Sequence, residues 1–292
     1  MIMNMTGGGS SPAEFVQKNG NFDSVTLVQS VELPTSINGV AMNQALNVQA
    51  ENNIFWQRLV FSAKKLIIPE YYTSAIIQGS FAYPYKAALE EIECYTAGQI
   101  TTNYYENYVN FHVFRAPNTT KTVKIALRPE NFKTVTLHLP KCPTIEPYIG
   151  KSPSTSSQPV DIYMVELDAD FSSCQTFGIV GGYIYNGKFW TGTVDLPECT
   201  KITYTYPEVG EATLYLPKVT QFTNYMMDGA SDTGGTAHLY IGPDLTTTGA
   251  INANWWQAKG SHIDFHIPPG DTTTKATLDA IGATYTQDYV IE

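Results

Sequence analysis

A short phrase recurs in the second half of this chain and constrains its fold more than any other feature. Its three copies are Leu139-Pro140-Lys141-Cys142, Leu196-Pro197-Glu198-Cys199 and Leu216-Pro217-Lys218-Val219. Each copy closes a short stretch of alternating apolar and polar residues, which is typical of a strand with one buried face. Because proline cannot donate the next hydrogen bond of a β-ladder, the phrase predicts a strand, a stop and a turn.

The composition favours a mainly β protein. Hydrophobic residues make up 43% of the chain and charged residues only 15%, against roughly a quarter in typical globular proteins. Threonine, serine, asparagine and the 19 tyrosines occupy that space, which suits sheets with polar but uncharged faces. We therefore expect a mainly β fold of two β-sandwich-like modules, with short helices and a flexible N-terminal arm.

Two segments without periodicity divide the chain. Residues 1–11 are rich in Met, Gly and Ser and predict a flexible arm, which we extend to residue 20. Residues 151–159 are rich in Ser and Pro and predict a linker or a long loop. The expected domains are the arm, a first β-rich domain over 21–150 and a second over 151–292. Residues 41–70 fit helix and strand equally well, and both remain open.

Two local patterns add detail. Residues 124–141 align without a gap with residues 201–218, which suggests an internal duplication. The strands expected at 123–127 and 135–139 then predict a duplicated β-hairpin. Residues 272–281 predict a helix that ends before Gly282.

Charge and hydropathy exclude several partners and compartments. The formal net charge is −10, and no Lys/Arg cluster is denser than Lys64-Lys65, so a nucleic-acid partner is not expected. The first eleven residues have neither the basic nor the apolar region of a signal peptide, and no apolar run approaches the ~18 residues of a membrane span. We expect synthesis in a cytoplasm and no membrane contact.

Four scattered cysteines, Cys94, Cys142, Cys174 and Cys199, form neither a disulfide framework nor a zinc motif. We predict buried thiols. Cys142 and Cys199 occupy the same place in the repeated phrase, which suggests equivalent core positions. A disulfide between these two is the alternative, which a cytoplasm disfavours.

The sharpest candidate for chemistry is the stretch His262-Ile263-Asp264-Phe265-His266. Alternate residues of a strand share a face, so His262, Asp264 and His266 would converge on one metal ion, with His238 as a fourth ligand. The alternative is a solvated strand face, with the interleaved apolar residues turned to the core. We favour the solvated face and expect no cofactor, because a single HxDxH stretch offers a metal no anchored second shell. Metal catalysis is disfavoured further, because no general base stands out nearby.

Three tryptophans are candidate ligand or interface residues: Trp255, Trp256 and Trp190. Trp255-Trp256 follows a loop rich in Thr, Gly and Asn, and would serve as a sugar-stacking platform or as the centre of a protein interface. The alternative is core packing, which is favoured for Trp190 because it lies inside an expected strand.

Two further patterns do not predict catalysis. Glu90, Glu91 and Glu93 lie on one element, so they do not face each other across a substrate as the carboxylates of a glycosidase do, and a solvated face is expected. Residues 232–234 spell the Asp-Thr-Gly tripeptide of aspartic proteases. They lack the apolar strand that leads into that motif and the second copy that shares the proton.

The opening stretch Met3-Asn4-Met5-Thr6-Gly7-Gly8-Gly9-Ser10-Ser11 resembles the starts of tail-associated virion proteins from phages of gut Firmicutes. This resemblance implies a phage structural protein with β-rich modules after the arm. The Leu-Pro step of the repeated phrase is also similar to the strand ends of surface leucine-rich repeats. The spacing argues against that family, since Leu196 and Leu216 are 20 residues apart but Leu139 and Leu196 are 57 apart.

Together these observations predict a structural or adhesive component of a phage virion, associated with the tail or baseplate, and not an enzyme. Its expected partners are copies of itself, other virion proteins and a glycan of the host surface. A carbohydrate-binding module is the alternative, and a metal-dependent enzyme is a more distant one.

Overall fold

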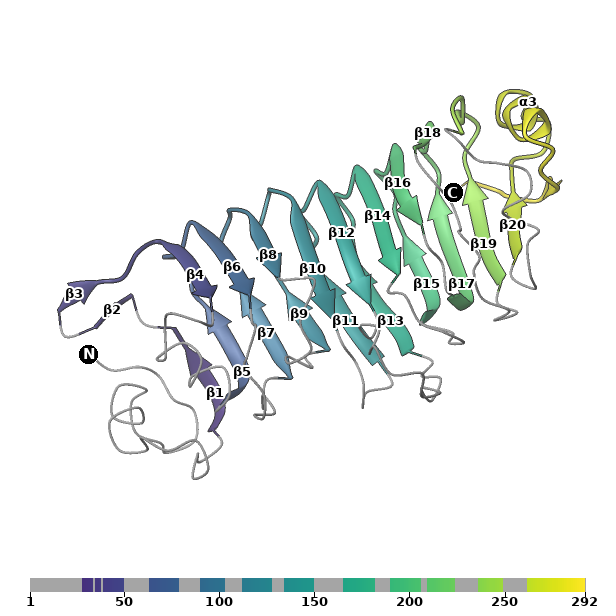
Figure 1. Cartoon of the computed structure of the whole chain (residues 1–292). Helices are drawn as coiled ribbons and strands as arrows, with labels where there is room; N and C mark the ends of the chain where they lie inside the picture. Colours follow the sequence, from purple (N-terminus) through teal and green to yellow (C-terminus); the bar gives the residue numbers. More distant parts are fainter. Residues whose placement is uncertain are drawn as a thin grey trace.

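The computed structural model shows a mainly β protein, as the composition predicted (Figure 1). It describes residues 28–33, 35–37, 39–49, 63–78, 90–102, 112–127, 134–149, 165–181, 190–205, 209–223, 236–248 and 262–291. The described strands form two long sheets and one small antiparallel pair. All neighbouring strands of the two long sheets pair in parallel. The predicted arm, residues 1–20, lies outside the described residues.

The first long sheet has eleven strands, nearly all of them odd-numbered. In spatial order these are β1 (Val28–Glu32), β5 (Ala63–Ile68), β7 (Glu91–Cys94), β9 (Val113–Arg115), β11 (Thr134–His138), β13 (Val165–Asp170), β15 (Trp190–Asp195), β17 (Val209–Leu216), β19 (Thr236–Ile241), β20 (His262–His266) and β21 (Tyr285–Thr286).

The second long sheet has eight strands, all even-numbered. In spatial order, starting from the same end of the stack, these are β4 (Ala45–Gln49), β6 (Ser74–Gln78), β8 (Ile100–Thr102), β10 (Val123–Leu127), β12 (Thr144–Ile149), β14 (Thr176–Gly181), β16 (Lys201–Thr205) and β18 (Gln221–Phe222). Strands β2 (Ser36–Ile37) and β3 (Val40–Ala41) form the small antiparallel pair, and α3 (Thr273–Ala280) lies near the C-terminal end (Figure 1).

The chain winds as a solenoid with two strands in each coil. From β5 to β17, each strand of the eleven-stranded sheet is followed, after a corner of four to seven residues, by a strand of the eight-stranded sheet, while residues 33–44, with β2 and β3, separate β1 from β4. The chain then returns to start the next coil. Parallel strands need a crossover between them, and here the strand in the opposite sheet supplies it. The described strands thus form one continuous stack (Figure 1).

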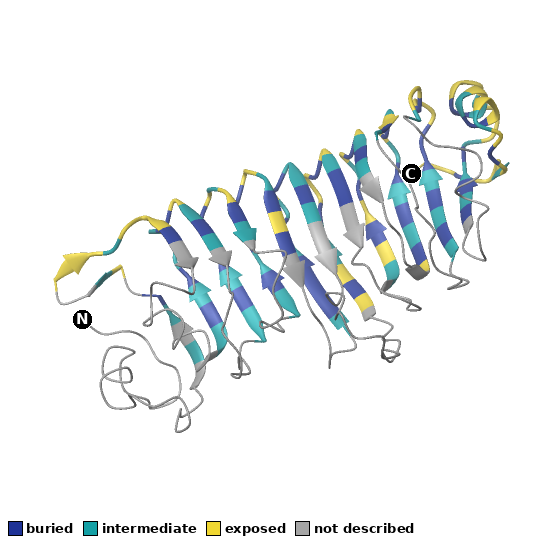
Figure 2. Cartoon of the chain, in the orientation of Figure 1, coloured by how far each residue is buried: buried dark blue, intermediate teal, exposed yellow. Residues whose placement is uncertain are grey.

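One hydrophobic cluster lies between the two sheets and runs along the stack. Strands alternate between buried and more exposed residues (Figure 2). Across the eight-stranded sheet, Val123, Ile145, Phe177, Ile202 and Phe222 stand in register and are all buried. Each coil therefore adds its apolar residues to the same interior, which is the reason why repeats of this kind stack.

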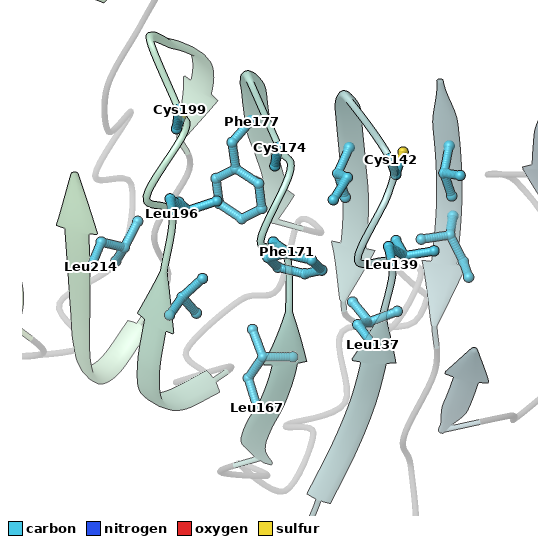
Figure 3. Packing of buried hydrophobic residues seen from close by; sticks show 14 of the residues in the cluster. Leu137, Leu139, Cys142, Leu167, Phe171, Cys174, Phe177, Leu196, Cys199 and Leu214 are labelled. Atoms are coloured by element: carbon cyan, nitrogen blue, oxygen red, sulfur yellow. The ribbon is translucent and has the colours of Figure 1, made fainter. Parts of the chain in front are cut away.

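The repeated phrase forms the corner of a coil, as predicted. Leu139 continues the ladder of β11 by donating its N–H to Asp170 O at 2.8 Å, and Pro140 then ends the strand. Cys142 N donates back to Leu139 O at 3.1 Å, and Cys199 N makes the same bond to Leu196 O at 3.1 Å. Both the leucine and the cysteine of each corner are buried, so the turn carries its own part of the core (Figure 3).

The sequence contains a corner that the repeated phrase did not reveal. Phe171 and Cys174 take the places of Leu139 and Cys142, with Cys174 N bonded to Phe171 O at 2.9 Å. Ser172 stands where the other copies have proline. The 57-residue interval before Leu196 therefore contains two coils, which explains the irregular spacing.

The predicted hairpins are wrong. Strand β10 pairs with β8 and β12, whereas β11 pairs with β9 and β13 in the other sheet. The alternation of apolar residues was recognised correctly, but it is the same for a hairpin and for the two strands of a coil. Residues 124–141 and 201–218 do occupy equivalent places, because β16 and β17 repeat the arrangement of β10 and β11.

The sandwich-like modules are not confirmed, since the two sheets consist of parallel strands from successive coils. The predicted linker at 151–159 lies outside the described residues, while β11 pairs with β13 and β12 with β14 across it. Of the open region 41–70, residues 45–49 and 63–68 are strands. The predicted C-terminal helix is confirmed as α3.

Helix α3 lies against the corner that follows β19. Thr274, which is fully buried, donates its hydroxyl to Gly242 O at 2.8 Å, and Thr277 donates to Leu245 O at 2.8 Å. These two carbonyl groups belong to the corner after β19, next to which a further coil would otherwise stack. Side-chain hydroxyls therefore satisfy the main chain at this end, as the capping units of repeat proteins do.

The four cysteines are free thiols and all are buried, as predicted. Cys174 lies on the coil between those of Cys142 and Cys199, so the latter pair is two strand spacings apart, about 10 Å. That separation is too long for a disulfide. Burial raises the pKa of Cys94 to about 12, that of Cys142 and Cys199 to about 11, and that of Cys174 further.

We expect all four thiols to be unreactive in the folded protein, because the thiolate is the nucleophile and burial suppresses it. At pH 8 a chromogenic disulfide reagent should modify them only as fast as the coils open, and should titrate four thiols at once in denaturant. Rapid modification of any cysteine without denaturant would contradict this arrangement.

Candidate functional site

Strands β19 and β20 place the predicted histidine motif on the outer face of the eleven-stranded sheet. Ile263, Phe265 and Ile267 are buried, with at most 3% of their surface exposed, so the motif turns its interleaved apolar residues to the core. His238 on β19 stands in register with Asp264 on β20. The outer position agrees with the solvated-face alternative.

The carboxylates around His238 do not converge on one point. His238 Nδ1 lies 3.5 Å from Asp264 Oδ2, while Nε2 lies 3.5 Å from Glu211 Oε1 on the other side. One metal ion does not reach both nitrogens of a single ring. The backbone of His262 belongs to β20, but its side chain lies outside the described residues. No group of three or more His, Cys, Asp and Glu residues within the described ranges is arranged to hold a metal.

His266 differs from a residue of a solvated face. Its side chain is only 14% exposed, and Nδ1 lies 2.8 Å from Asp288 Oδ1. Its ring stacks on Tyr240, with centroids 4.3 Å apart and planes 10° from parallel. The expectation of a solvated side chain is therefore wrong for His266, because the C-terminal residues fold back over it.

We call residues 287–291 the C-terminal strap. Tyr289 of the strap donates its N–H to Ile267 O at 3.1 Å and is only 8% exposed. Its ring packs against Tyr240 and Tyr215, at centroid distances of 5.4 and 6.2 Å. Tyr215 and Tyr240 are register partners whose rings stack at 4.7 Å. The strap thus closes an aromatic cluster on the outer face of β17, β19 and β20.

The surroundings keep these tyrosines neutral. Burial raises the pKa of Tyr240, and the neighbouring Tyr215 and Asp288 raise it further. Burial also raises the pKa of Tyr289, with added contributions from Tyr215 and Asp195. Tyr240 and Tyr289 therefore stay protonated near neutral pH. The ring contacts of the cluster fasten the chain end.

We expect Tyr289→Ala to lower the free energy of unfolding of the C-terminal coils by about 2 kcal/mol, the cost of exposing a buried aromatic contact. The matched control is Val290→Ala, since Val290 is 75% exposed; it should change stability by less than about 0.5 kcal/mol. Urea denaturation followed by tyrosine fluorescence measures both. Equal effects of the two variants would show that the strap is not fastened by Tyr289.

The carboxylates of β7 form an ion-pair network, as their strand position on the outer face allows. Lys65 Nζ lies 2.6 Å from Glu93 Oε1 and 3.1 Å from Glu91 Oε1. Arg115 on the other side contacts Glu91 and lies 3.9 Å from Glu93. Both carboxylates are therefore neutralised by cations from the adjacent coils. This arrangement joins three coils and leaves neither carboxylate free for acid–base work.

The network shifts the pKa of Glu93. Burial alone would raise the pKa of Glu93, but the hydrogen bond and charge of Lys65 outweigh it, so that the pKa of Glu93 is lowered. A carboxyl group whose pKa is lower in the folded state stabilises the fold above its unfolded pKa. That contribution is lost as the pH falls through the folded pKa.

We expect Glu93→Gln to destabilise the protein at pH 7 by no more than about 1 kcal/mol, since the pair is partly exposed. The difference from the parent should shrink as the pH falls below about 4, where glutamate protonates. Glu198→Gln is the control, because its pair with Lys218 at 2.6 Å has both side chains about half exposed. Denaturation curves at several pH values test this; a pH-independent difference would contradict it.

The tryptophans are placed only in part. Trp190 is the first residue of β15, although its side chain lies outside the described residues. Trp255 and Trp256 lie outside them as well, in the connection between Thr248 and His262. That connection leaves the eight-stranded sheet and returns to the eleven-stranded sheet. Thr247, just before this connection, bridges to Gln221 at the start of β18, and His262, just after it, begins β20.

A scan of the chain against protein-family models finds no matching family, and searches of curated proteins and of solved structures find no match. No helix within the described ranges is long and apolar enough to span a membrane.

Proposed function

We propose that this chain is a structural and adhesive protein of a phage virion, associated with the tail or baseplate, whose solenoid is a rigid scaffold for binding loops. The support comes from the contrast between the two edges of the solenoid. At one edge the corners have four to seven residues. At the other edge the connections range from residues 206–208 to residues 150–164. We call this second edge the insertion edge.

The connections at the insertion edge differ from the corners in composition as well as in length. They make up less than a third of the chain but contain more than half of its Phe, Tyr and Trp residues. Insertions in a repeat protein collect on one face, which is often the binding face. Aromatic residues are the side chains that most often dominate binding energy. The insertion edge is therefore the proposed contact surface for the host.

The class of ligand that fits best is a glycan of the host surface, because aromatic rings offer apolar faces for sugar rings. Trp255 and Trp256 are the proposed contacts. A carbohydrate-binding module outside a virion remains the alternative within the same class of activity. The two differ in assembly, since the virion protein is expected to associate with copies of itself.

The test is binding of the full chain to cell-wall polysaccharide purified from gut Firmicutes. Tryptophan fluorescence titration should show saturable binding, and the Trp255→Ala/Trp256→Ala variant should weaken it at least tenfold. Thr193→Ala, at an exposed position of β15 on the outer sheet face, is the control and should bind as the parent does. Binding that is unaffected by the tryptophan substitutions would overturn their assignment, and no binding to any such polysaccharide would overturn the glycan.

A further inference from the structure

The two ends of the solenoid differ in how their main-chain groups are hydrogen-bonded. At the C-terminal end, the eleven-stranded sheet finishes in the two-residue strand β21, and α3 is hydrogen-bonded to the corner that follows β19. At the N-terminal end, both sheets finish in five-residue strands, β1 and β4. Within the described ranges, neither strand has a partner on its outer side.

The backbone of β1 shows which groups face outward. In parallel pairing, the N–H and C=O of one residue point to the same neighbour. Leu33 donates its N–H to Ile67 O of β5 at 2.9 Å, so alternate residues before it also face β5. Val28, Ser30 and Glu32 therefore direct their main-chain groups to the open side. In β4 the equivalent groups belong to Ala45, Asn47 and Gln49, of which the Ala45 N–H is already bonded to Asn43 Oδ1 at 3.0 Å.

The usual protection of an edge strand is weak at this end. Natural sheets guard their edges with charged residues, proline or bulges. Strands β1 and β4 contain a single charged residue between them, Glu32. The small pair β2–β3 extends beyond these edges (Figure 1), and Val40 at its tip is 71% exposed. Open main-chain groups and an exposed apolar side chain thus occur at the same end.

We propose that this end is the site of self-association, and that a second copy pairs with it edge to edge around a two-fold axis. This inference rests on the proposed self-association of the virion protein and names the surface that performs it. At the other end of the described strands, α3 is bonded to the last corner and the eleven-stranded sheet stops at the two-residue β21, so the N-terminal end of a second copy is the matching partner. A two-fold axis perpendicular to both sheets sets β1 antiparallel to β1 of the partner and β4 antiparallel to β4.

The sequence of β1 fits such an axis at its centre. With Ser30 on the axis, Ser30 faces Ser30 of the partner, and Val28 faces Glu32 of the partner. All three outward residues then exchange main-chain hydrogen bonds, and the single charge does not face its own copy. Because a two-fold interface is closed and the other end is capped, the expected product is a discrete dimer and not a fibre.

Ser30 supplies the decisive variants. Light scattering should give the mass of two chains for the parent at micromolar concentration. Ser30→Pro removes an outward N–H that pairs with none of the described strands of its own chain, and should give monomers with an unchanged circular dichroism spectrum. Paired residues in antiparallel strands have Cα atoms about 5.5 Å apart, within disulfide range. Ser30→Cys should therefore form a disulfide-linked dimer on mild oxidation, whereas Thr193→Cys, exposed in the middle of the sheet, should not.

Each contrary result has a distinct meaning. A parent that is monomeric at all concentrations would overturn the inference and the proposed self-association, and would show that the chain covers its own edge. A dimer that persists in Ser30→Pro, with no more cross-linking of Ser30→Cys than of Thr193→Cys, would overturn only the inference and place self-association elsewhere. The glycan titration is independent of both results.

Discussion

The structure depends on the parallel main-chain ladder, which each coil extends and none can complete alone. A single coil contributes one strand to each sheet and a few apolar residues. Both edges of each strand must then form hydrogen bonds with the strands of neighbouring coils. Burial of Leu139, Cys142 and their counterparts at the corners links the two sheets on every coil. Stability therefore comes from the contacts between neighbouring coils, and ion pairs such as Lys65–Glu93 are additions on the outer face.

The chemistry of the outer face follows from this arrangement. Register places equivalent residues of successive coils side by side, so a residue type that recurs becomes a row. Tyr215, Tyr240 and His266 form one such row, and the ring stacking is a direct result of the short strand spacing. Rows of this kind bury ring faces against each other. The proposed function therefore assigns ligand contact to the aromatic residues of the insertion edge and not to such rows.

The sequence was sufficient to recognise the strand, the stop and the turn, because alternation and proline act locally. It did not distinguish parallel coils from hairpins, since the connection at 128–133 has a length that serves either. Variable connections also hid the period, and Ser172 in place of proline hid one corner. Of the candidate site, the orientation of Asp264 was predictable from alternation. The partner of His266 was not, because Asp288 reaches it through a fold of the chain that no local pattern specifies.

The constant spacing of the strands has a consequence for how such a molecule changes size. Each coil advances the stack by one strand spacing, about 4.8 Å, so eleven strands span about 48 Å. A duplicated or deleted coil changes this length by one step and leaves the cross-section, the corners and both ends as they were. The length of the solenoid is thus a whole number of strand spacings. Chains with different numbers of coils would therefore form solenoids of different length that keep the same two ends.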